Sequence, residues 1–304
     1  MGIKRSITKS NEDSNSSAQA GKANKKAKNA SEPLDPSLPN NTQFPEAFKF
    51  TKQEGSLTIA SYNVASLRAC LQKGFKRYVD AEDADILCVQ ETKVNTPVAT
   101  AVDDKVYKYR YWSHEEKKGY GGTAVFSKFK PESVTYGLPG YEDKSRGRVI
   151  VLTFPAFTLI ACYVPNAGDK LVRLPDRQVF NGHMEKYIRS LQKEGKSVVW
   201  TGSAGFTIEE RTDFSKVLDR SEEENQPGLI DTWRHFHPDT RGHYTYYSFR
   251  MKCREKLLGW RLDYFVVTPD LLDKVVASEM RHEAWGASDH IPIVLTLKDI
   301  HLDE

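Results

Sequence analysis

Eight short apolar segments, rich in β-branched residues, recur beyond residue 55 and constrain the fold more than any other feature of this chain. Their lengths and composition are typical of strands. They cover residues 56–64, 84–91, 122–127, 148–154, 157–164, 197–202, 261–268 and 291–297. A chain with this many strands buries its apolar surface by packing sheets against each other or against helices.

Four stretches between these strands are predicted to be helical, at residues 67–82, 174–194, 207–218 and 269–276. Thr207 and Glu210 have the spacing of a capping box, and Asp213 and Lys216 follow on the polar side of that helix. There is no Gly-rich phosphate loop. We therefore expect two packed sheets with helices outside them, and not a single doubly wound sheet.

Residues 1–50 differ from the rest in composition, since Ser, Asn, Lys, Ala and Pro dominate and large apolar side chains are scarce. Such a segment cannot offset its chain entropy by burial, so we predict a disordered tail followed by one domain over residues 51–304. Its basic residues resemble a nuclear localisation signal: Lys4, Arg5, Lys22, Lys25, Lys26 and Lys28. Two other interpretations are a plain linker and a myristoylated N-terminus at Gly2. The acidic Glu12 and Asp13 argue against a mitochondrial transit peptide.

Charge and cysteine content exclude some classes of function. The net charge is +3, so a site for a polyanion depends on local clusters of Lys and Arg. The four cysteines are far apart and indicate neither a zinc site nor a disulfide framework, which favours a reducing compartment. No apolar run approaches the ~20 residues that cross a bilayer, so we expect a soluble intracellular protein without stable membrane association.

Polar side chains stand at the ends of several predicted strands, where a core would not need them. These are Asn63, Gln90, Glu91, Tyr163, Asn166, Asp263, Asp289 and His290. If the strand ends meet at one rim, these residues form a single site. Oxygen ligands with one histidine and no thiolate favour Mg²⁺ over zinc.

Six motifs in this order resemble the endonuclease/exonuclease/phosphatase superfamily, and within it the exonuclease III type of apurinic/apyrimidinic endonucleases. They are SYNVASLRA, ILCVQETK, GYGGTAVFSK, GRVIVLTF with YVPNAG, GWRLDYF and SDHIPI, and they span roughly Leu57 to Leu297. The resemblance implies a four-layered α/β sandwich with two mixed sheets between helices. It also implies hydrolysis of the phosphodiester bond 5′ to an abasic site in double-stranded DNA, as part of base excision repair.

The same resemblance implies a metal site and a catalytic pair. Glu91 would be the principal ligand of Mg²⁺, or of Mn²⁺ as an alternative, with Asn63 beside it and Asp289 at an outer or second position. His290 would donate a hydrogen bond to the scissile phosphate, and Asp263 would orient its ring. Tyr163 and Asn166 resemble neutral phosphate contacts of the family.

DNA contacts are implied in or beside the same motifs. Arg68, Lys93, Tyr120, Arg148 and Arg173 would meet backbone phosphates, and Arg250 lies where relatives insert a side chain into the duplex. Trp260 and Leu262, with Tyr246 or Phe249, resemble the apolar pocket that receives a sugar without a base. For each of these residues the alternative is ordinary: a solvated basic residue or a packed aromatic ring.

One segment of the family is missing at Gly202/Ser203. In relatives this strand runs into an Asp, one further residue and an Asn, followed by a long polar loop; here Ser203 begins the next matching segment. The lost Asp would orient or deprotonate the attacking water. Glu209 and Glu210 are the nearest carboxylates, but the first turn of a helix explains them without a catalytic role. We expect the fold to survive, and an alternative transcript or skipped exon would account for the clean cut.

Three further positions depart from relatives. Ala65 replaces an Asp found near the metal in some of them, and Asp169 replaces an Arg that faces DNA. Ala60 stands where one member has a redox-regulatory cysteine, so no redox role is expected there.

The sequence therefore predicts an apurinic/apyrimidinic endonuclease with impaired activity. Two alternatives are an inactive form that still binds DNA and a related phosphodiesterase with another substrate. We expect a monomer in the nucleus, with the cytoplasm or mitochondrion as alternatives, and repair proteins as partners of the tail.

Overall fold

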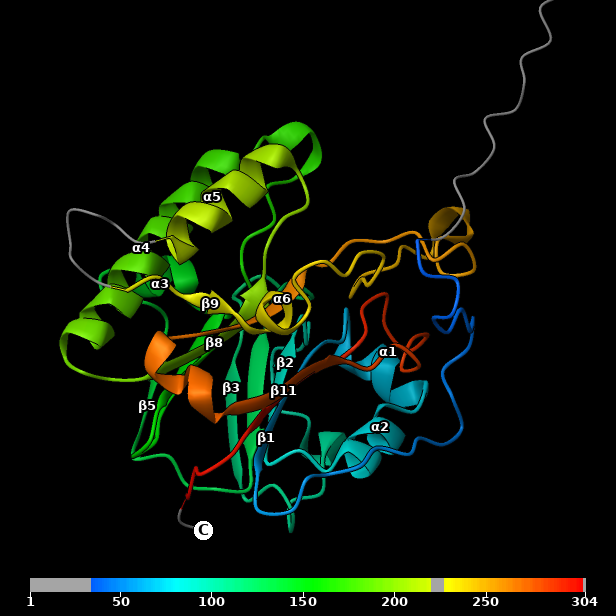
Figure 1. The fold of residues 1–304 in the computed structure, drawn as a ribbon, viewed down its shortest axis with the longest axis horizontal. Coiled ribbons are helices and arrows are strands. Elements are labelled where there is room, and N and C mark those ends of the chain that lie inside the picture. The colour runs from blue at the N-terminus through cyan, green and yellow to red at the C-terminus, as the bar shows by residue number, and fades with distance from the viewer. Residues whose placement is uncertain (1–33, 220–226, 303–304) are drawn as a thin grey trace, which may run out of the picture. The chain divides into compact units, whose positions relative to one another are not determined.

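Two six-stranded sheets form the centre of the molecule in a computed structural model that describes residues 34–219 and 227–302 (Figure 1). The strand order of the first sheet is β11-β12-β1-β2-β4-β3. Its strands are β1 (Leu57–Asn63), β2 (Ile86–Gln90), β3 (Tyr109–Ser113), β4 (Thr123–Ser127), β11 (Val275–Met280) and β12 (Ile293–Leu297). Only β1 and β2 pair in parallel in this sheet.

The second sheet has the order β5-β6-β7-β8-β10-β9. Its strands are β5 (Ser133–Tyr136), β6 (Val149–Thr153), β7 (Thr158–Cys162), β8 (Val198–Ser203), β9 (Ile230–Asp231) and β10 (Asp263–Val267). Here β7 and β8 are the parallel pair. Each sheet is therefore mixed, as predicted.

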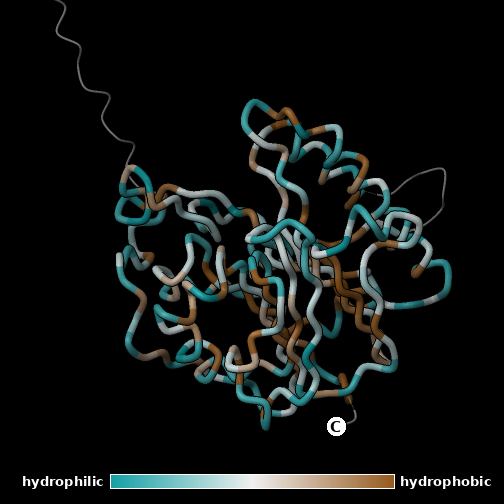
Figure 2. Tube along the Cα trace, turned by 180° about the vertical axis from the view of Figure 1, so that it is seen from behind, coloured by the Kyte–Doolittle hydropathy of each residue, from teal (hydrophilic) through white to brown (hydrophobic). Residues whose placement is uncertain are grey.

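Three apolar clusters fix the layers. One lies between the sheets and includes Ile59, Cys88, Leu152 and Phe265. A second joins the outer face of the first sheet to α1 (Leu67–Gln72) and α2 (Phe75–Glu82), and a third joins the second sheet to α4 (Leu174–Lys193) and α5 (Ile208–Leu218). Figure 2 shows the hydrophobic colours gathered on the central strands. This is the predicted four-layered sandwich.

All eight predicted strands are present, and four more occur among the described residues. β3 and β5 are partly exposed strands whose polar and aromatic residues gave no clear apolar run, and β9 has only two residues. β11 was missed because its first residues were assigned to a helix. In the structure, residues Pro269–Lys274 form a 3₁₀ helix and the chain enters β11 at Val275, so the predicted helix over 269–276 is wrong in type and end.

The predicted helix over 67–82 is also wrong as a single element, because Gly74 interrupts it with φ of 105°, a conformation that glycine adopts at low cost. The helices α4 and α5 are confirmed. Short helices α3 (Glu142–Ser145) and α6 (Thr232–Phe236) were not predicted. Within the described residues, no helix is long and apolar enough to cross a membrane.

Residues 34–50, assigned to the disordered tail, pack against the folded part. Phe44 is buried, Phe48 and Phe50 contact Tyr78, and the Asn41 amide donates to the carbonyls of Glu283 and Trp285. The aromatic and amide contacts were missed because their partners lie far along the chain. The nuclear localisation residues and Gly2 lie outside the described residues.

Candidate active site

The polar strand ends meet at one rim because of strand direction and register. Parallel pairing brings the carboxyl ends of β1 and β2 together, so Asn63 lies opposite Gln90 and next to Glu91. In the second sheet Ser203, the last residue of β8, pairs with Asp263, the first residue of β10. The chain that leads into β12 carries Asp289 and His290 to the same rim, since Ser61 of β1 pairs with Ile293.

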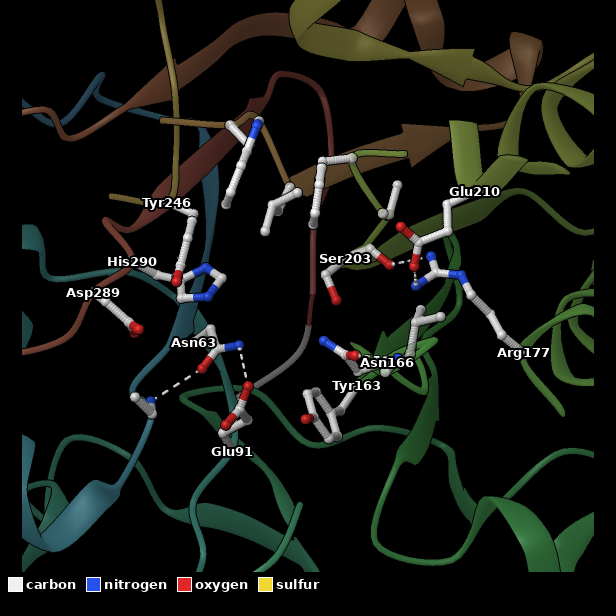
Figure 3. Close-up of a pocket in the computed structure, with 18 of the residues that line it drawn as sticks. Asn63, Glu91, Tyr163, Asn166, Arg177, Ser203, Glu210, Tyr246, Asp289 and His290 are labelled. Atoms are coloured by element: carbon white, nitrogen blue, oxygen red, sulfur yellow. Dashed lines mark hydrogen bonds and ion pairs between the residues drawn. The ribbon is translucent and has the colours of Figure 1, made fainter. Parts of the chain in front are cut away.

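A cavity of about 330 Å³ opens at this rim. Ten of the residues predicted for the site line it: Asn63, Glu91, Lys93, Tyr163, Asn166, Tyr246, Trp260, Leu262, Asp289 and His290. Figure 3 shows Glu91 and Asn63 together, with His290 and Asp289 on one side of them and Tyr163 and Asn166 on the other. The predicted polar strand ends thus meet in one cavity, apart from Gln90 and Asp263, which do not line it.

Glu91 is held by two donors. The Asn63 amide nitrogen lies 3.0 Å from its Oε1, and the Lys93 ammonium nitrogen lies 2.9 Å from its Oε2. Glu91 and Lys93 both have positive φ angles, 53° and 52°, as does Ala65 at 53°. Non-glycine residues in this region are uncommon and cluster at functional sites, so the backbone here is shaped to place side chains.

The donor set at Glu91 fits a hard divalent cation. Glu91 supplies a carboxylate and Asp289 lines the same cavity, while Asn63 bonds to Glu91 through its amide nitrogen and accepts from the Ala65 amide with its oxygen. No group of three His, Cys, Asp or Glu side chains in the described residues is arranged to enclose a metal ion. A cation at Glu91 would therefore keep several water or phosphate ligands, which is how Mg²⁺ is commonly bound.

His290 and Asp263 form the buried pair predicted for them. Nδ1 of His290 lies 2.7 Å from Oδ2 of Asp263. Burial acts to lower the pKa of His290, but the charge and hydrogen bond of Asp263 outweigh it, with smaller contributions from Asp289 and Glu91, and the pKa rises to about 9. The ring is therefore an imidazolium at neutral pH and a hydrogen-bond donor on both nitrogens.

The main chain around His290 is tied to the end of β1. The Ser288 hydroxyl donates to the carbonyl oxygen of Asn63 at 2.7 Å and accepts from the His290 amide at 3.2 Å. These contacts connect the histidine to the Glu91 side of the cavity.

Tyr163 and Asn166 face this pair as neutral donors. Burial and the negative charge of Glu91 raise the pKa of Tyr163 well above its usual value, so its phenol stays protonated. The Arg148 guanidinium lies over its ring at 5.2 Å. The Asn166 side-chain oxygen accepts from the Gly168 amide at 2.6 Å. Its amide nitrogen has no hydrogen-bond partner among the described residues, which suits contact with an anionic oxygen.

The junction at residue 203 completes the wall of the cavity. Beyond the end of β8, one further backbone hydrogen bond extends the sheet, from the Ala204 amide to the Leu262 carbonyl at 2.7 Å. Thr207 is the N-cap of α5. Figure 3 shows Ser203 above Asn166, with His290 on one side and Glu210 and Arg177 on the other. The linker is short, and the expected capping box is confirmed by both of its hydrogen bonds.

Glu210 lines the cavity, but its carboxylate is engaged. It is 5% exposed, receives a charged hydrogen bond from Arg177 at 3.3 Å and accepts from the Thr207 amide at 3.3 Å. Arg177 also donates to the carbonyls of Pro165 and Ser203. The Glu210 carboxylate is thus held by Arg177 and by the start of α5, and is not free to contact a ligand in the cavity.

Sequence reasoning missed Arg177 and Phe206. Arg177 lies within a long amphipathic helix, where a basic residue normally indicates a solvated face. Phe206 stacks on Trp260 with ring centroids 4.1 Å apart and an interplanar angle of 13°. Tyr246 also lies parallel to Trp260, at 5.6 Å. Nothing in the sequence connects Phe206 with Trp260.

The residues predicted to contact DNA are divided among three places. Lys93 lies in the main cavity, and Arg148 and Arg173 line a neighbouring cavity of about 220 Å³ with Tyr141 and Lys144. Arg68, Tyr120 and Arg250 lie on the surface, outside these two cavities. Phe249 packs on Trp285 and does not line the main cavity, which leaves Tyr246 as the aromatic partner of Trp260 there.

Comparison with known proteins agrees with this geometry. Residues 60–290 match the sequence profile of the endonuclease/exonuclease/phosphatase family. The chain is 37% identical over 300 residues to the DNA repair nuclease APEX1 of Danio rerio. The aligned region covers 90% of this chain and 93% of that protein. It is 36% identical over 263 residues to a DNA-(apurinic or apyrimidinic site) endonuclease of Dictyostelium discoideum, covering 79% and 70%.

Solved structures give the same relationship in three dimensions. The crystal structure of the AP endonuclease LMAP from Leishmania major is similar with a TM-score of 0.67 and 26% identity, over 86% of this chain and 97% of that one.

Proposed function

Because this chain belongs to the endonuclease/exonuclease/phosphatase family, whose members include metal-dependent nucleases, we propose that it recognises abasic sites in double-stranded DNA. The reaction is hydrolysis of the phosphodiester bond 5′ to the abasic sugar, as a step of base excision repair. The observation that carries the proposal is the His290–Asp263 pair, which faces Glu91, Tyr163 and Asn166 across one cavity.

Each of these side chains has a role that its environment supports. The His290 imidazolium donates to a phosphate oxygen and carries a positive charge where negative charge develops, while Asp263 fixes the ring through Nδ1. Tyr163 and Asn166 supply neutral donors to the same phosphate from the opposite wall. Donors that are already in place cost no reorganisation during the reaction.

Glu91 and Asn63 would hold Mg²⁺, or Mn²⁺ in its place, and Asp289 would serve an outer or second position. When bound, this ion supplies Lewis-acid polarisation of a phosphoryl oxygen. Lys93, which pairs with Glu91, partly balances the carboxylates when the ion is absent.

The residue that would activate water is missing. Ser203 ends β8 at the position where relatives begin their catalytic segment, and a serine hydroxyl is a poor base. Since Glu210 is engaged by Arg177, we expect the rate to fall by about 10²- to 10⁴-fold, the usual contribution of a positioned base. This supports a second candidate function, an inactive form that binds abasic DNA and competes with active nucleases.

The first experiment is nicking of a duplex that carries one tetrahydrofuran abasic analogue, with Mg²⁺ and with EDTA. A matched chain has an Asp-containing loop restored after Gly202. Anisotropy in EDTA measures binding by both chains. Binding by both with cleavage by the restored chain alone supports the proposal; failure of both chains to prefer abasic DNA refutes it and favours a phosphodiesterase with another substrate.

We further propose that the protein acts on DNA as a monomer in the nucleus. The basic residues of the N-terminal segment support nuclear import, and a nuclear repair function agrees with the similarity to DNA repair nucleases. Fusing residues 1–50 to a fluorescent protein tests this, since exclusion of the fusion from nuclei contradicts it. Repair proteins that bind this segment would be its partners.

A further inference from the structure

A loop of residues 249–258 starts and ends at the mouth of the cavity. Tyr246 and Trp260, which both line the cavity, are joined by two backbone hydrogen bonds of 3.0 Å, from the amide of each to the carbonyl of the other. The loop between them exposes Arg250 and Lys252. Cations beside a site for a polyanion add affinity by meeting its backbone phosphates. The loop is therefore placed to hold a nucleic-acid strand next to the cavity.

The backbone of this loop has an uncommon conformation. Met251, Lys252 and Leu257 have φ angles of 55°, 55° and 51°, and the Met251 side chain is 79% exposed. Non-glycine residues with such angles carry an energetic cost and persist only where the surrounding structure holds them. Since the loop exposes so much of its outer side, that support comes from the side on which it packs.

Arg254 supplies this support from inside the loop. It is 1% exposed, and its guanidinium lies over the Tyr247 ring at 4.6 Å. Its Nη2 atom donates to the His282 carbonyl and, at 2.9 Å, to the side-chain oxygen of Asn41. The Arg254 carbonyl in turn accepts from the Leu257 amide within the loop. A buried guanidinium is costly unless acceptors meet it, so the position of the loop depends on these partners.

Asn41 belongs to a strap of residues 34–44 that runs past this loop (Figure 1). Its side-chain nitrogen donates to the carbonyls of Glu283 and Trp285, at 3.1 and 3.2 Å. Its side-chain oxygen is thereby turned toward Arg254. One amide thus connects the strap, the chain around residue 284 and the buried guanidinium of the loop.

Two further contacts fix the strap on either side of Asn41. Before it, Oδ2 of Asp35 lies 3.1 Å from Nε2 of His243. After it, Phe44 is buried, and its main chain is so close to Gly286 that a Cβ atom on this glycine would overlap it. The strap is therefore seated at both ends and can present the Asn41 oxygen in a constant place.

We propose that Asn41 is a positioning residue for DNA binding, which fixes Arg254 and through it the cationic loop at the cavity mouth. This inference rests on the proposed function, because it makes the DNA backbone the ligand of the loop. Without Asn41 the loop spends less time in the position that binds, and the affinity falls in proportion to that fraction. The His290–Asp263 pair lies outside this set of contacts, so the loss concerns binding and not the chemical step.

The experiment measures binding of the full chain to a duplex with one tetrahydrofuran abasic analogue, by anisotropy in EDTA. Asn41→Ala removes the acceptor for Arg254, and Asn41→Asp keeps it. Ser37→Ala is the matched control, since Ser37 is an exposed strap residue whose hydroxyl donates to Asp35. Each variant is also made in a background with Arg250→Gln and Lys252→Gln, which lacks the loop cations.

Asn41→Ala should weaken binding by about 10-fold, the lower end of what a hydrogen bond to a charged group contributes, and should reduce the salt dependence of binding. Asn41→Asp and Ser37→Ala should bind as wild type does. In the background without loop cations Asn41→Ala should change the affinity little, because both changes act through one loop. A general loss of stability would instead weaken binding equally in both backgrounds.

Three outcomes refute this role of Asn41: equal losses in the two backgrounds, no loss in the wild-type background, or the same loss for Asn41→Asp as for Asn41→Ala. Absence of duplex binding by wild type refutes the proposed function instead. Hydrogen exchange of the wild-type chain needs no variant and applies even if Asn41→Ala fails to fold. Saturating abasic duplex should slow exchange of residues 41–44 together with the loop, and protection of the loop alone refutes the coupling.

Discussion

Replacing Ser203 by Asp should restore much of the missing catalysis without restoring the missing loop. Ser203 is the last residue of β8, pairs with Asp263 and lines the cavity between His290 and the Arg177–Glu210 pair (Figure 3). A carboxylate here would start from the strand position at which we propose that a catalytic segment is absent.

The electrostatics of the cavity support such a base. Burial and the Glu91 and Asp289 carboxylates should raise the pKa of the new carboxyl. The His290 imidazolium and the Arg177 guanidinium, which donates to the Ser203 carbonyl, act in the opposite direction. A base works best when its pKa approaches the working pH. We therefore expect Ser203→Asp to increase the nicking rate by about 10²-fold, the lower end of the contribution of a positioned base.

Single-turnover nicking of the tetrahydrofuran duplex with excess Mg²⁺ is the assay, since it reports the chemical step and not product release. Ser203→Asn is the matched control, because it has the same shape and no basic oxygen. An unchanged rate in Ser203→Asp, with binding preserved, would show that the lost segment supplied more than its carboxylate. Equal gains in both variants would show that side-chain size at residue 203, and not a base, limits the reaction.

Three other predictions address the metal, the buried ion pair and acid stability. Glu91→Gln, made in the Ser203→Asp background, should raise the Mg²⁺ concentration for half-maximal nicking by at least about 10-fold in a Mg²⁺ titration. An unchanged Mg²⁺ concentration would contradict the role of Glu91 as a metal ligand. Glu210→Ala leaves the Arg177 guanidinium buried and unpaired, so urea unfolding should show a loss of about 3–5 kcal/mol; a loss under about 1 kcal/mol would contradict the role of this pair. Burial, with help from His243, lowers the pKa of His282 to about 3, below its ordinary value near 6.5. The neutral ring contributes stability above pH 6.5 that is lost as the pH falls toward 3. Between pH 7 and 4.5 the native chain should therefore lose about 2 kcal/mol more than His282→Gln, and parallel pH curves would refute this.

Strands and helices were predictable where one periodic pattern decided them. The β1 and β8 segments are short, almost fully buried runs that contain β-branched residues, and the capping box indicates where α5 begins. The errors arose where tertiary contacts overrode the local pattern. β11 is a strand because it pairs with β12, although Pro269 and the residues after it favour a helical start. Phe44 is buried in a segment whose composition alone indicates disorder.

The site was predictable for residues that belong to chemical motifs and not for those that only the packing brings in. His290 and Asp263 are 27 residues apart in sequence and were paired correctly because each motif carries its own role. Arg177 comes from a helix interior, and Phe206 comes from a linker that joins β8 to α5. Their positions depend on how two sheets and a short junction close around the cavity, which periodicity does not encode.

The junction at residue 203 supports our proposal that the fold can survive the loss of a catalytic segment there. The fold needs β8 to end beside β10 and α5 to begin with a capped turn, and both needs are met by the Ala204–Leu262 bond and the Thr207 cap. The Arg177–Glu210 pair then closes the same wall from inside. None of these contacts requires a carboxylate that faces the phosphate. A chain can therefore keep the metal ligands, the imidazolium and the apolar pocket in place while it lacks the base, and such a chain would bind abasic DNA far better than it cuts it.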